Sequence, residues 1–175
     1  MCLVCFRLDI TDSACKKFIS LATNALITQC PRQQVVIVWY CDQGVARYSN
    51  ESFLGTMHES PMIAMWNREN SLDIWDLTSD KNGFMQVLIN TMNKAAENAS
   101  SGAVDKKFAT QEGRFKANLT SLDTVYTLAE CTPDITLREC NHCLGVTIGN
   151  ISELCNVKAG CTLMCPNCNI RYDTY

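Results

Sequence analysis

The chain has 175 residues, of which 47% are hydrophobic and 19% charged, and its formal net charge at pH 7 is -3. This composition is typical of a globular protein and excludes an intrinsically disordered one, and the negative charge argues against binding to a nucleic-acid backbone. The longest apolar run, residues 35–41, is too short to span a bilayer. Arg7 and Asp9 interrupt the apolar N-terminus, so no secretory signal is expected in the sequence as given.

The first part of the chain predicts a helix followed by a β-hairpin. Apolar residues recur at intervals of three and four over residues 11–29, and Thr11 or Asp12 can cap this helix. Residues 35–40 are β-branched and aromatic, which predicts a strand buried on both faces, with residues 45–49 as its hairpin partner.

The same order of elements then begins again and continues to the C-terminus. An amphipathic helix is expected over residues 80–99, ending in a loop at residues 98–102, and a second helix over residues 136–154. We expect Trp66 to pack in the core of the sheet. The predicted strands of this part are residues 62–66, 107–111, 122–128, 158–164 and 169–175.

Cysteines and strands mark an imperfect internal repeat. The order Cys5, Cys15, helix, Cys30, strand, Val45-Ala46-Arg47-Tyr48 parallels the order Cys131, Cys140, helix, Cys155, strand, Asn169-Ile170-Arg171-Tyr172. The first copy starts midway through the pattern. We therefore expect a partial first domain over residues 1–60 and a second domain over residues 61–175.

Seven of the twelve cysteines lie between Cys131 and Cys168, and they support two interpretations. One is a set of disulfides. The other is a structural zinc site in an intracellular protein, because two CxxC pairs, Cys140/Cys143 and Cys165/Cys168, follow each other at roughly the interval of a zinc ribbon.

The repeat favours disulfides. The positions equivalent to Cys143 and Cys168 in the first copy are Phe18 and Gly44, so both cysteines of one predicted pair are absent together. A disulfide predicts joint loss, because a single remaining thiol would be reactive. The predicted pairs are Cys131–Cys140, Cys143–Cys168 and Cys5–Cys15. Spacing assigns no partner to Cys2, Cys30, Cys41, Cys155, Cys161 or Cys165, although Cys155–Cys161 and Cys155–Cys165 are both open.

Glycosylation sequons also indicate the secretory pathway. The four N-x-Ser/Thr sequons are at Asn50, Asn98, Asn118 and Asn150. Together with twelve cysteines, they favour a protein of the extracellular space or cell surface, where disulfides persist.

The sequence contains few features that indicate an enzyme. It contains no Gly-rich phosphate loop, no HRD or DFG kinase motif and no GxSxG motif. His142 is next to Cys143, but neighbouring residues on a helix point about 100° apart, which argues against a catalytic dyad. We therefore expect no catalytic residue, no metal and no cofactor.

Three blocks of the sequence resemble a known family. They are Cys131-x8-Cys140-x2-Cys143 with Phe108-Ala109-Thr110 ahead of it, Cys168-Asn169-Ile170-Arg171-Tyr172 behind it, and, in the first half, Arg47-Tyr48-Ser49-Asn50. Together they resemble the plant cysteine-rich stress-antifungal (ginkbilobin-homologous) domain. Nearly the whole chain is similar to the tandem domains of cysteine-rich receptor-like kinase ectodomains and cysteine-rich repeat secretory proteins.

The resemblance implies an α+β fold of tandem domains, each with an antiparallel sheet of about five strands against two helices, stapled by disulfides. It also implies a non-catalytic binding module of stress or defence signalling in the apoplast or at the cell surface, with a glycan or a cell-surface protein as partner. Some members bind mannose through an Asn, an Arg and a Glu, which correspond here to Asn67, Thr162 and Asp173. Because Thr162 lacks the charged fork of an arginine, the sequence argues against mannose binding.

Overall fold

The computed structural model describes residues 2–4, 11–40, 44–66, 78, 80–102, 107–117, 122–155 and 158–174. The chain divides into two compact units, Met1–Met57 (unit 1) and His58–Tyr175 (unit 2). No helix in the described ranges combines the length and the apolar character that crossing a bilayer requires.

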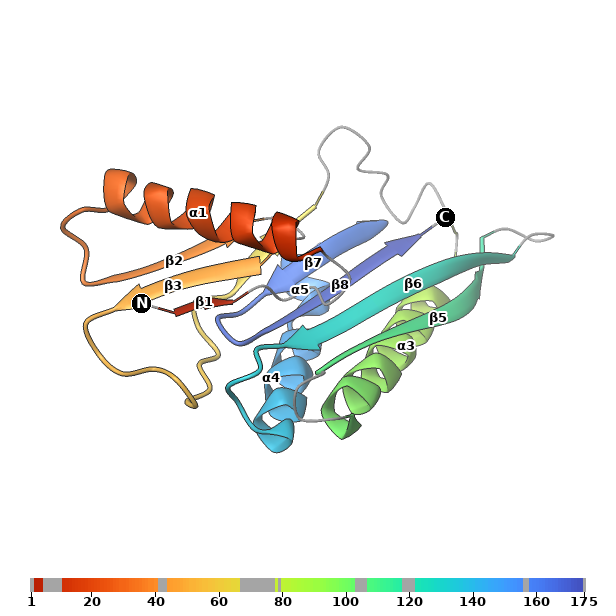
Figure 1. Cartoon of the computed structure of the whole chain (residues 1–175). Helices are drawn as coiled ribbons and strands as arrows, with labels where there is room; N and C mark the ends of the chain where they lie inside the picture. Colours follow the sequence, from red (N-terminus) through yellow and green to blue (C-terminus); the bar gives the residue numbers. More distant parts are fainter. Residues whose placement is uncertain are drawn as a thin grey trace. The chain divides into compact units, whose positions relative to one another are not determined.

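Unit 1 is one helix on a three-stranded antiparallel sheet. Its elements are β1 (Cys2–Val4), α1 (Asp12–Gln29), β2 (Val35–Tyr40) and β3 (Gly44–Ser49), and the strand order is β1-β3-β2. The predicted cap is confirmed, because the Thr11 side chain accepts a hydrogen bond from the backbone N–H of Ala14. Helix α1 lies along one face of this sheet (Figure 1).

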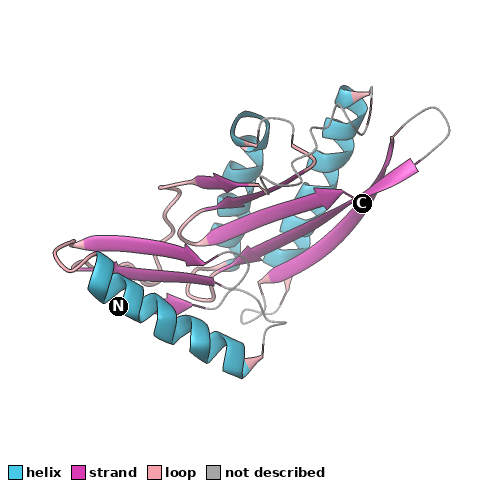
Figure 2. Cartoon of the chain, turned by 90° about the horizontal axis from the view of Figure 1, so that it is seen from above, coloured by secondary structure: helices cyan, strands magenta, loops and turns pink. Residues whose placement is uncertain are grey.

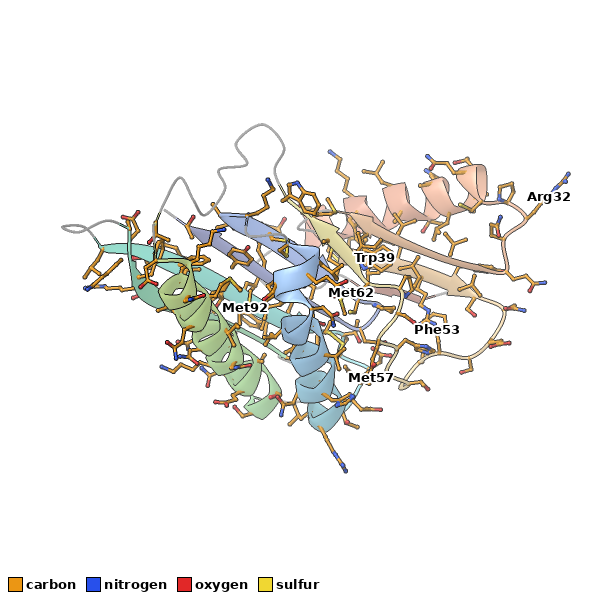
Figure 3. The ribbon with its side chains drawn as sticks, turned by 180° about the vertical axis from the view of Figure 1, so that it is seen from behind. Arg32, Trp39, Phe53, Met57, Met62 and Met92 are labelled. Carbon is orange, nitrogen blue, oxygen red and sulfur yellow. A yellow bond between two sulfur atoms is a disulfide. The ribbon has the colours of Figure 1, made fainter. Side chains whose placement is uncertain are left out.

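The core of unit 1 is small. Phe18, Ala22 and Leu26 of α1 are buried against Ala46 of β3, with Val36 and Val38 packed around them. The expectation that β2 is buried on both faces is wrong. Its side chains are only half-buried and that of Val35 is 52% exposed, because the helix covers a single face of the sheet. Arg47 follows Ala46 in β3, and its guanidinium lies 4.2 Å from the ring centroid of Phe53. Figure 3 labels Phe53 and Trp39 of β2.

Unit 2 has two layers, a sheet and the helices that cover one of its faces. Its elements are β4 (Ile63–Met65), α3 (Lys81–Ser101), β5 (Phe108–Lys116), β6 (Leu122–Cys131), α4 (Leu137–Gly149), α5 (Ile151–Leu154), β7 (Gly160–Met164) and β8 (Cys168–Thr174). The strands form a five-stranded antiparallel sheet in the order β4-β7-β8-β6-β5. Helices α3 and α4 lie side by side on the same face of this sheet (Figures 1 and 2). The predicted α+β fold is confirmed, and the described part of unit 1 has fewer strands and helices than unit 2.

The core of unit 2 lies between this sheet and α3. Phe84, Leu88 and Met92 of α3 are fully buried, and Figure 3 shows Met92 on the inner side of the helix. The ring of Phe84 meets Phe115 of β5 edge-on, with 4.8 Å between the centroids. Gly113 of β5 lets this strand approach α3 closely, because a Cβ at this position would lie 2.9 Å from a methyl group of Val87.

Two helix boundaries differ from the sequence prediction. Helix α3 continues to Ser101, although composition predicted a loop from Asn98. The hydroxyl of Ser100 donates to the carbonyl of Ala96 within the last turn, a contact that is compatible with helical backbone. The predicted single helix over residues 136–154 is divided at Asn150, whose side-chain amide donates to the carbonyl of Val146.

A capping box fixes the start of α4. The Thr136 hydroxyl accepts a hydrogen bond from the Glu139 backbone N–H, and the Glu139 carboxylate accepts one from the Thr136 backbone N–H. That bond, together with one from the Thr136 hydroxyl, lowers the pKa of Glu139 below its usual value. These hydrogen bonds fix the first turn of α4, which contains Cys140, the first cysteine of this helix.

Candidate functional site

Two disulfides attach α4 to the sheet. Cys131–Cys140 joins the end of β6 to the first turn of α4, with 5.7 Å between the Cα atoms. Cys143–Cys168 joins the next turn of α4 to the start of β8, with 6.1 Å between the Cα atoms. Cys131 and Cys168 are also direct partners in the β6–β8 register. Both predicted bridges are confirmed, and they hold one end of α4 over the ends of two neighbouring strands.

A third bridge settles the pairing that the spacing left open. Cys155, at the end of α5, is bonded to Cys161 of β7, and both residues are buried. In unit 1, Cys15 is disulfide-bonded, whereas its predicted partner Cys5 lies outside the described residues, as does Cys41. Cys30, after the end of α1, is a half-buried free thiol.

The zinc interpretation does not fit the arrangement of the sulfur atoms. The Sγ atoms of Cys143, Cys165 and Cys168 lie within 4.8 Å of one another, and zinc requires such sulfurs as thiolates. Two of the three are bonded to each other, and Cys140 of the same predicted site is bonded to Cys131. Three of the four predicted zinc ligands are therefore disulfide sulfurs.

Cys165 is a buried thiol beside the Cys143–Cys168 bridge. The hydroxyl of Thr147 lies 3.5 Å from its Sγ and 3.4 Å from that of Cys168. Burial raises the pKa of the Cys165 thiol, and the contact with Thr147 opposes this change without cancelling it. The thiol is therefore protonated at neutral pH, the unreactive form of cysteine.

His142 takes no part in this sulfur cluster. Its Nε2 atom lies 2.9 Å from a carboxylate oxygen of Glu59, and both side chains are largely exposed, at 61% and 45%. Because Cys143 is in a disulfide, it offers His142 no thiolate. Cys143 therefore has a structural role, and His142 and Glu59 form a polar contact at the surface.

The open face of the unit 2 sheet brings together two of the three predicted sugar-site residues. Thr162 of β7 is opposite Arg171 of β8, and Gly160 is opposite Asp173, so Thr162 and Asp173 are diagonal neighbours on one face. Gly160 leaves space for the carboxylate, since a Cβ at this position would lie 2.7 Å from Asp173 Oδ1. The third residue, Asn67, lies outside the described residues.

Sequence reasoning missed Arg171 as a member of this site. Its Nε atom donates to Asp173 Oδ2 at 2.6 Å, and each of the two side chains is about one-third exposed, at 32% and 31%. The guanidinium that position 162 lacks is therefore present on the neighbouring strand. The alternation of Asn169, Arg171 and Asp173 along a predicted strand was the signal that could have found it.

Exposed apolar side chains accompany this polar group on the open face. Tyr126 of β6, opposite Asp173, is 45% exposed, and Met65 of β4, opposite Thr162, is 41% exposed. Trp66 follows Met65 and is 41% exposed, so the expectation that it packs in the core is wrong. Tyr126 therefore places a partly exposed aromatic ring on the same face as the Arg171–Asp173 ion pair.

The predicted sequons lie in different environments. Asn50 is exposed in the turn after β3, and Asn98 is exposed on α3. Asn150 is half-buried, and its Nδ2 atom, the one a glycan would occupy, donates to the carbonyl of Val146. Asn118 lies outside the described residues.

The chain is similar to known plant proteins over nearly its whole length. The chain is 32% identical over 169 residues to cysteine-rich receptor-like protein kinase 25 of Arabidopsis thaliana, an alignment of 97% of this chain and 23% of that protein. It is 33% identical over 170 residues to cysteine-rich receptor-like protein kinase 10 of the same plant, again over 97% and 23%. The chain thus spans less than a quarter of these relatives, and their names include a kinase.

The fold is similar to solved tandem DUF26 ectodomains of Arabidopsis thaliana. For the cysteine-rich receptor-like protein PDLP8 the TM-score is 0.72 at 19% identity, covering 98% of this chain and 71% of the other. For PDLP5 the TM-score is 0.65 at 19% identity, with the same coverage. The family model described as salt stress response/antifungal matches residues 76–175. With its three described bridges and its helix-covered antiparallel sheet, the chain belongs to the salt stress response/antifungal (DUF26) family.

Proposed function

We propose that this chain is a non-catalytic extracellular binding module of stress or defence signalling, comparable to the ectodomain of a cysteine-rich receptor-like kinase or to a secreted cysteine-rich repeat protein. The observation that carries the proposal is the disulfide framework of unit 2, since such bridges persist in the apoplast and at the cell surface and not in the cytosol. We propose the tandem organisation as a partial domain over residues 1–60 and a second domain over residues 61–175.

The open face around Arg171 and Asp173 is the proposed recognition surface of the second domain. A carboxylate and a guanidinium supply acceptors and donors in a fixed geometry, and Tyr126 offers an aromatic surface next to them. A hydroxyl-rich glycan and a polar loop of a cell-surface protein both fit this chemistry. No metal or cofactor takes part in the proposed interaction.

Mannose is not the proposed ligand of the natural sequence. The position aligned with the arginine of the mannose-binding members is Thr162, and Arg171 is already bonded to Asp173. The guanidinium of this face is therefore held on β8, whereas the mannose-binding arrangement has it at the position of Thr162 on β7.

Exchange of the two positions tests this assignment. The variant Thr162→Arg/Arg171→Thr/Asp173→Glu moves the guanidinium to β7 and lengthens the carboxylate, and we expect it to gain mannose binding on a glycan array. Thr162→Arg alone is the matched control, because it places two arginines directly opposite each other on β7 and β8, and we expect no gain. If the triple variant forms all its disulfides and still does not bind mannose, Asn67, Thr162 and Asp173 are not the sugar-site positions.

The same array separates the two classes of partner. A glycan bound by the natural chain and lost with Asp173→Asn would identify the module as a lectin. The natural chain could instead bind no glycan on the array and bind a plant cell-surface protein. If Tyr126→Ala weakened that binding, the result would identify a protein-interaction module.

A further inference from the structure

The outer edge of β5 carries main-chain groups that point away from the sheet. β5 pairs with β6 on one side, and no other described strand pairs with it (Figure 1). The backbone N–H of Cys131 donates to the carbonyl of Lys107, so these two opposite residues form a hydrogen-bonded pair. Because hydrogen-bonded and non-hydrogen-bonded pairs alternate along an antiparallel ladder, Thr110, Glu112 and Arg114 direct their N–H and C=O groups outward.

A side-chain hydrogen bond shows the same direction at the end of the strand. The hydroxyl of Thr78, which is not part of β6, donates to the carbonyl of Lys116 at 2.6 Å, and Lys116 alternates in step with Glu112 and Arg114. β5 has nine residues, with neither a proline nor a bulge, the devices that commonly protect an edge strand. The edge is therefore occupied at Lys116 and suited to pairing around Glu112 and Arg114.

The charges of β5 favour one register for pairing with a second copy of this strand. Glu112 and Arg114 are exposed on the open face, whereas Gly113 between them faces α3. If two β5 strands pair antiparallel about Gly113, Glu112 of each copy lies opposite Arg114 of the other. Pairing about Glu112 would instead place two like charges directly opposite each other, which is unfavourable.

Gly113 also suits the centre of that pairing. The two Gly113 residues would form a non-hydrogen-bonded pair, in which the Cα atoms are about 4.5 Å apart and opposite side chains are closest. A glycine brings no side chain to this point of closest approach. The outward main-chain groups, the glycine and the two charges therefore agree on one two-fold axis.

We propose that β5 is a dimerisation edge, to which a second copy of this chain adds its own β5 about a two-fold axis at Gly113. Main-chain hydrogen bonds join Glu112 of each copy to Arg114 of the other, and the two side chains form an ion pair on the open face. The two sheets become continuous, so both open faces point to the same side. The dimer thus presents two Arg171–Asp173 surfaces to a multivalent ligand, a consequence that rests on the proposed function.

Sedimentation velocity of the full chain over a range of concentrations tests the dimer. We expect a reversible monomer–dimer equilibrium that salt weakens, because the ion pairs are exposed. Glu112→Arg and Arg114→Glu each place like charges opposite each other in the homodimer, and we expect each variant to self-associate about tenfold more weakly. Glu153→Arg makes the same change of charge at an exposed residue of α5 and is the control, which we expect to leave self-association unchanged.

Mixing the two charge variants separates ion pairing from a folding defect. In a heterodimer of the Glu112→Arg chain with the Arg114→Glu chain, every arginine again lies opposite a glutamate, so we expect the mixture to associate as the natural chain does. The double variant Glu112→Arg/Arg114→Glu should also form homodimers for the same reason. A natural chain that stays monomeric up to about 1 mM, a mixture that does not associate, or an equal loss with Glu153→Arg would each overturn the proposal. The glycan array measures binding at the Arg171–Asp173 face separately, so failure of the dimer is distinguishable from failure of the proposed function.

Discussion

Replacing Phe84 with alanine is expected to lower the free energy of unfolding of unit 2 by about 3–5 kcal/mol, the range for a large aromatic side chain removed from a packed core. Phe84 is 1% exposed and packs edge-on against Phe115, so its removal leaves a cavity between α3 and β5. Urea unfolding followed by circular dichroism, with the disulfides intact, measures the change.

A second phenylalanine is the control for this experiment. Phe108 is on the same strand as Phe115 but is 39% exposed, and we expect Phe108→Ala to cost about 1 kcal/mol or less. The double variant Phe84→Ala/Phe115→Ala should show a coupling of about 0.5–1.5 kcal/mol for the ring pair. Equal losses for Phe84→Ala and Phe108→Ala would mean that α3 does not pack on the sheet as described.

Removing the Cys143–Cys168 bridge is expected to lower the free energy of unfolding by about 3.5 kcal/mol, because the bridge closes a loop of 25 residues. Both cysteines must be replaced together, as Cys143→Ala/Cys168→Ala. A single substitution would leave a thiol within reach of Cys165, whose sulfur lies within 4.8 Å of both. Urea unfolding without reductant measures the loss.

The shortest bridge of unit 2 is the comparison. Cys155–Cys161 has a sequence separation of 6, and the same relation gives about 2.2 kcal/mol for Cys155→Ala/Cys161→Ala. The order of the two losses is the decisive result. A larger loss from the short loop than from the long one would contradict the view that the bridges act by restricting the unfolded chain.

The sequence predicts the features of this fold that local chemistry decides. The cap at Thr11, the two disulfides on α4 and the five strands of unit 2 each follow from residue types at fixed spacing. The repeat was visible because cysteines and the Arg-Tyr pairs of β3 and β8 recur in the same order. The described registers extend that repeat to individual residue pairs.

The errors arose where tertiary context decides. The apolar run of β2 predicted burial on two faces, but among the described residues of unit 1 α1 packs on one face of the sheet and the β2 side chains are half-buried or exposed. Trp66 was expected in the core of the sheet, but it follows the short edge strand β4 and is exposed. The Ser-rich end of α3 stays helical because Ala95, Ala96 and Ala99 of its last turns are buried, and packing overrides the loop-like composition.

The candidate site could be predicted only in part. Thr162 and Asp173 were found by resemblance, and the structure places them on one face. Arg171 was missed because the resemblance compares single positions, although Arg171 and Asp173 lie two residues apart on β8 and their ion pair is local. What no local pattern states is that Thr162 of β7 lies opposite Arg171, because strand order is a long-range property.

Disulfide mapping of the non-reduced chain tests the central claim most directly. Thiols are first blocked by alkylation, and the chain is then cleaved by an asparaginyl endopeptidase, which separates Cys140 from Cys143 at Asn141. We expect mass spectrometry to find Cys131 linked to Cys140, Cys143 to Cys168 and Cys155 to Cys161, with Cys30 and, once the protein is denatured, Cys165 alkylated. Alkylation of both Cys143 and Cys168, with release of a metal ion, would contradict the account.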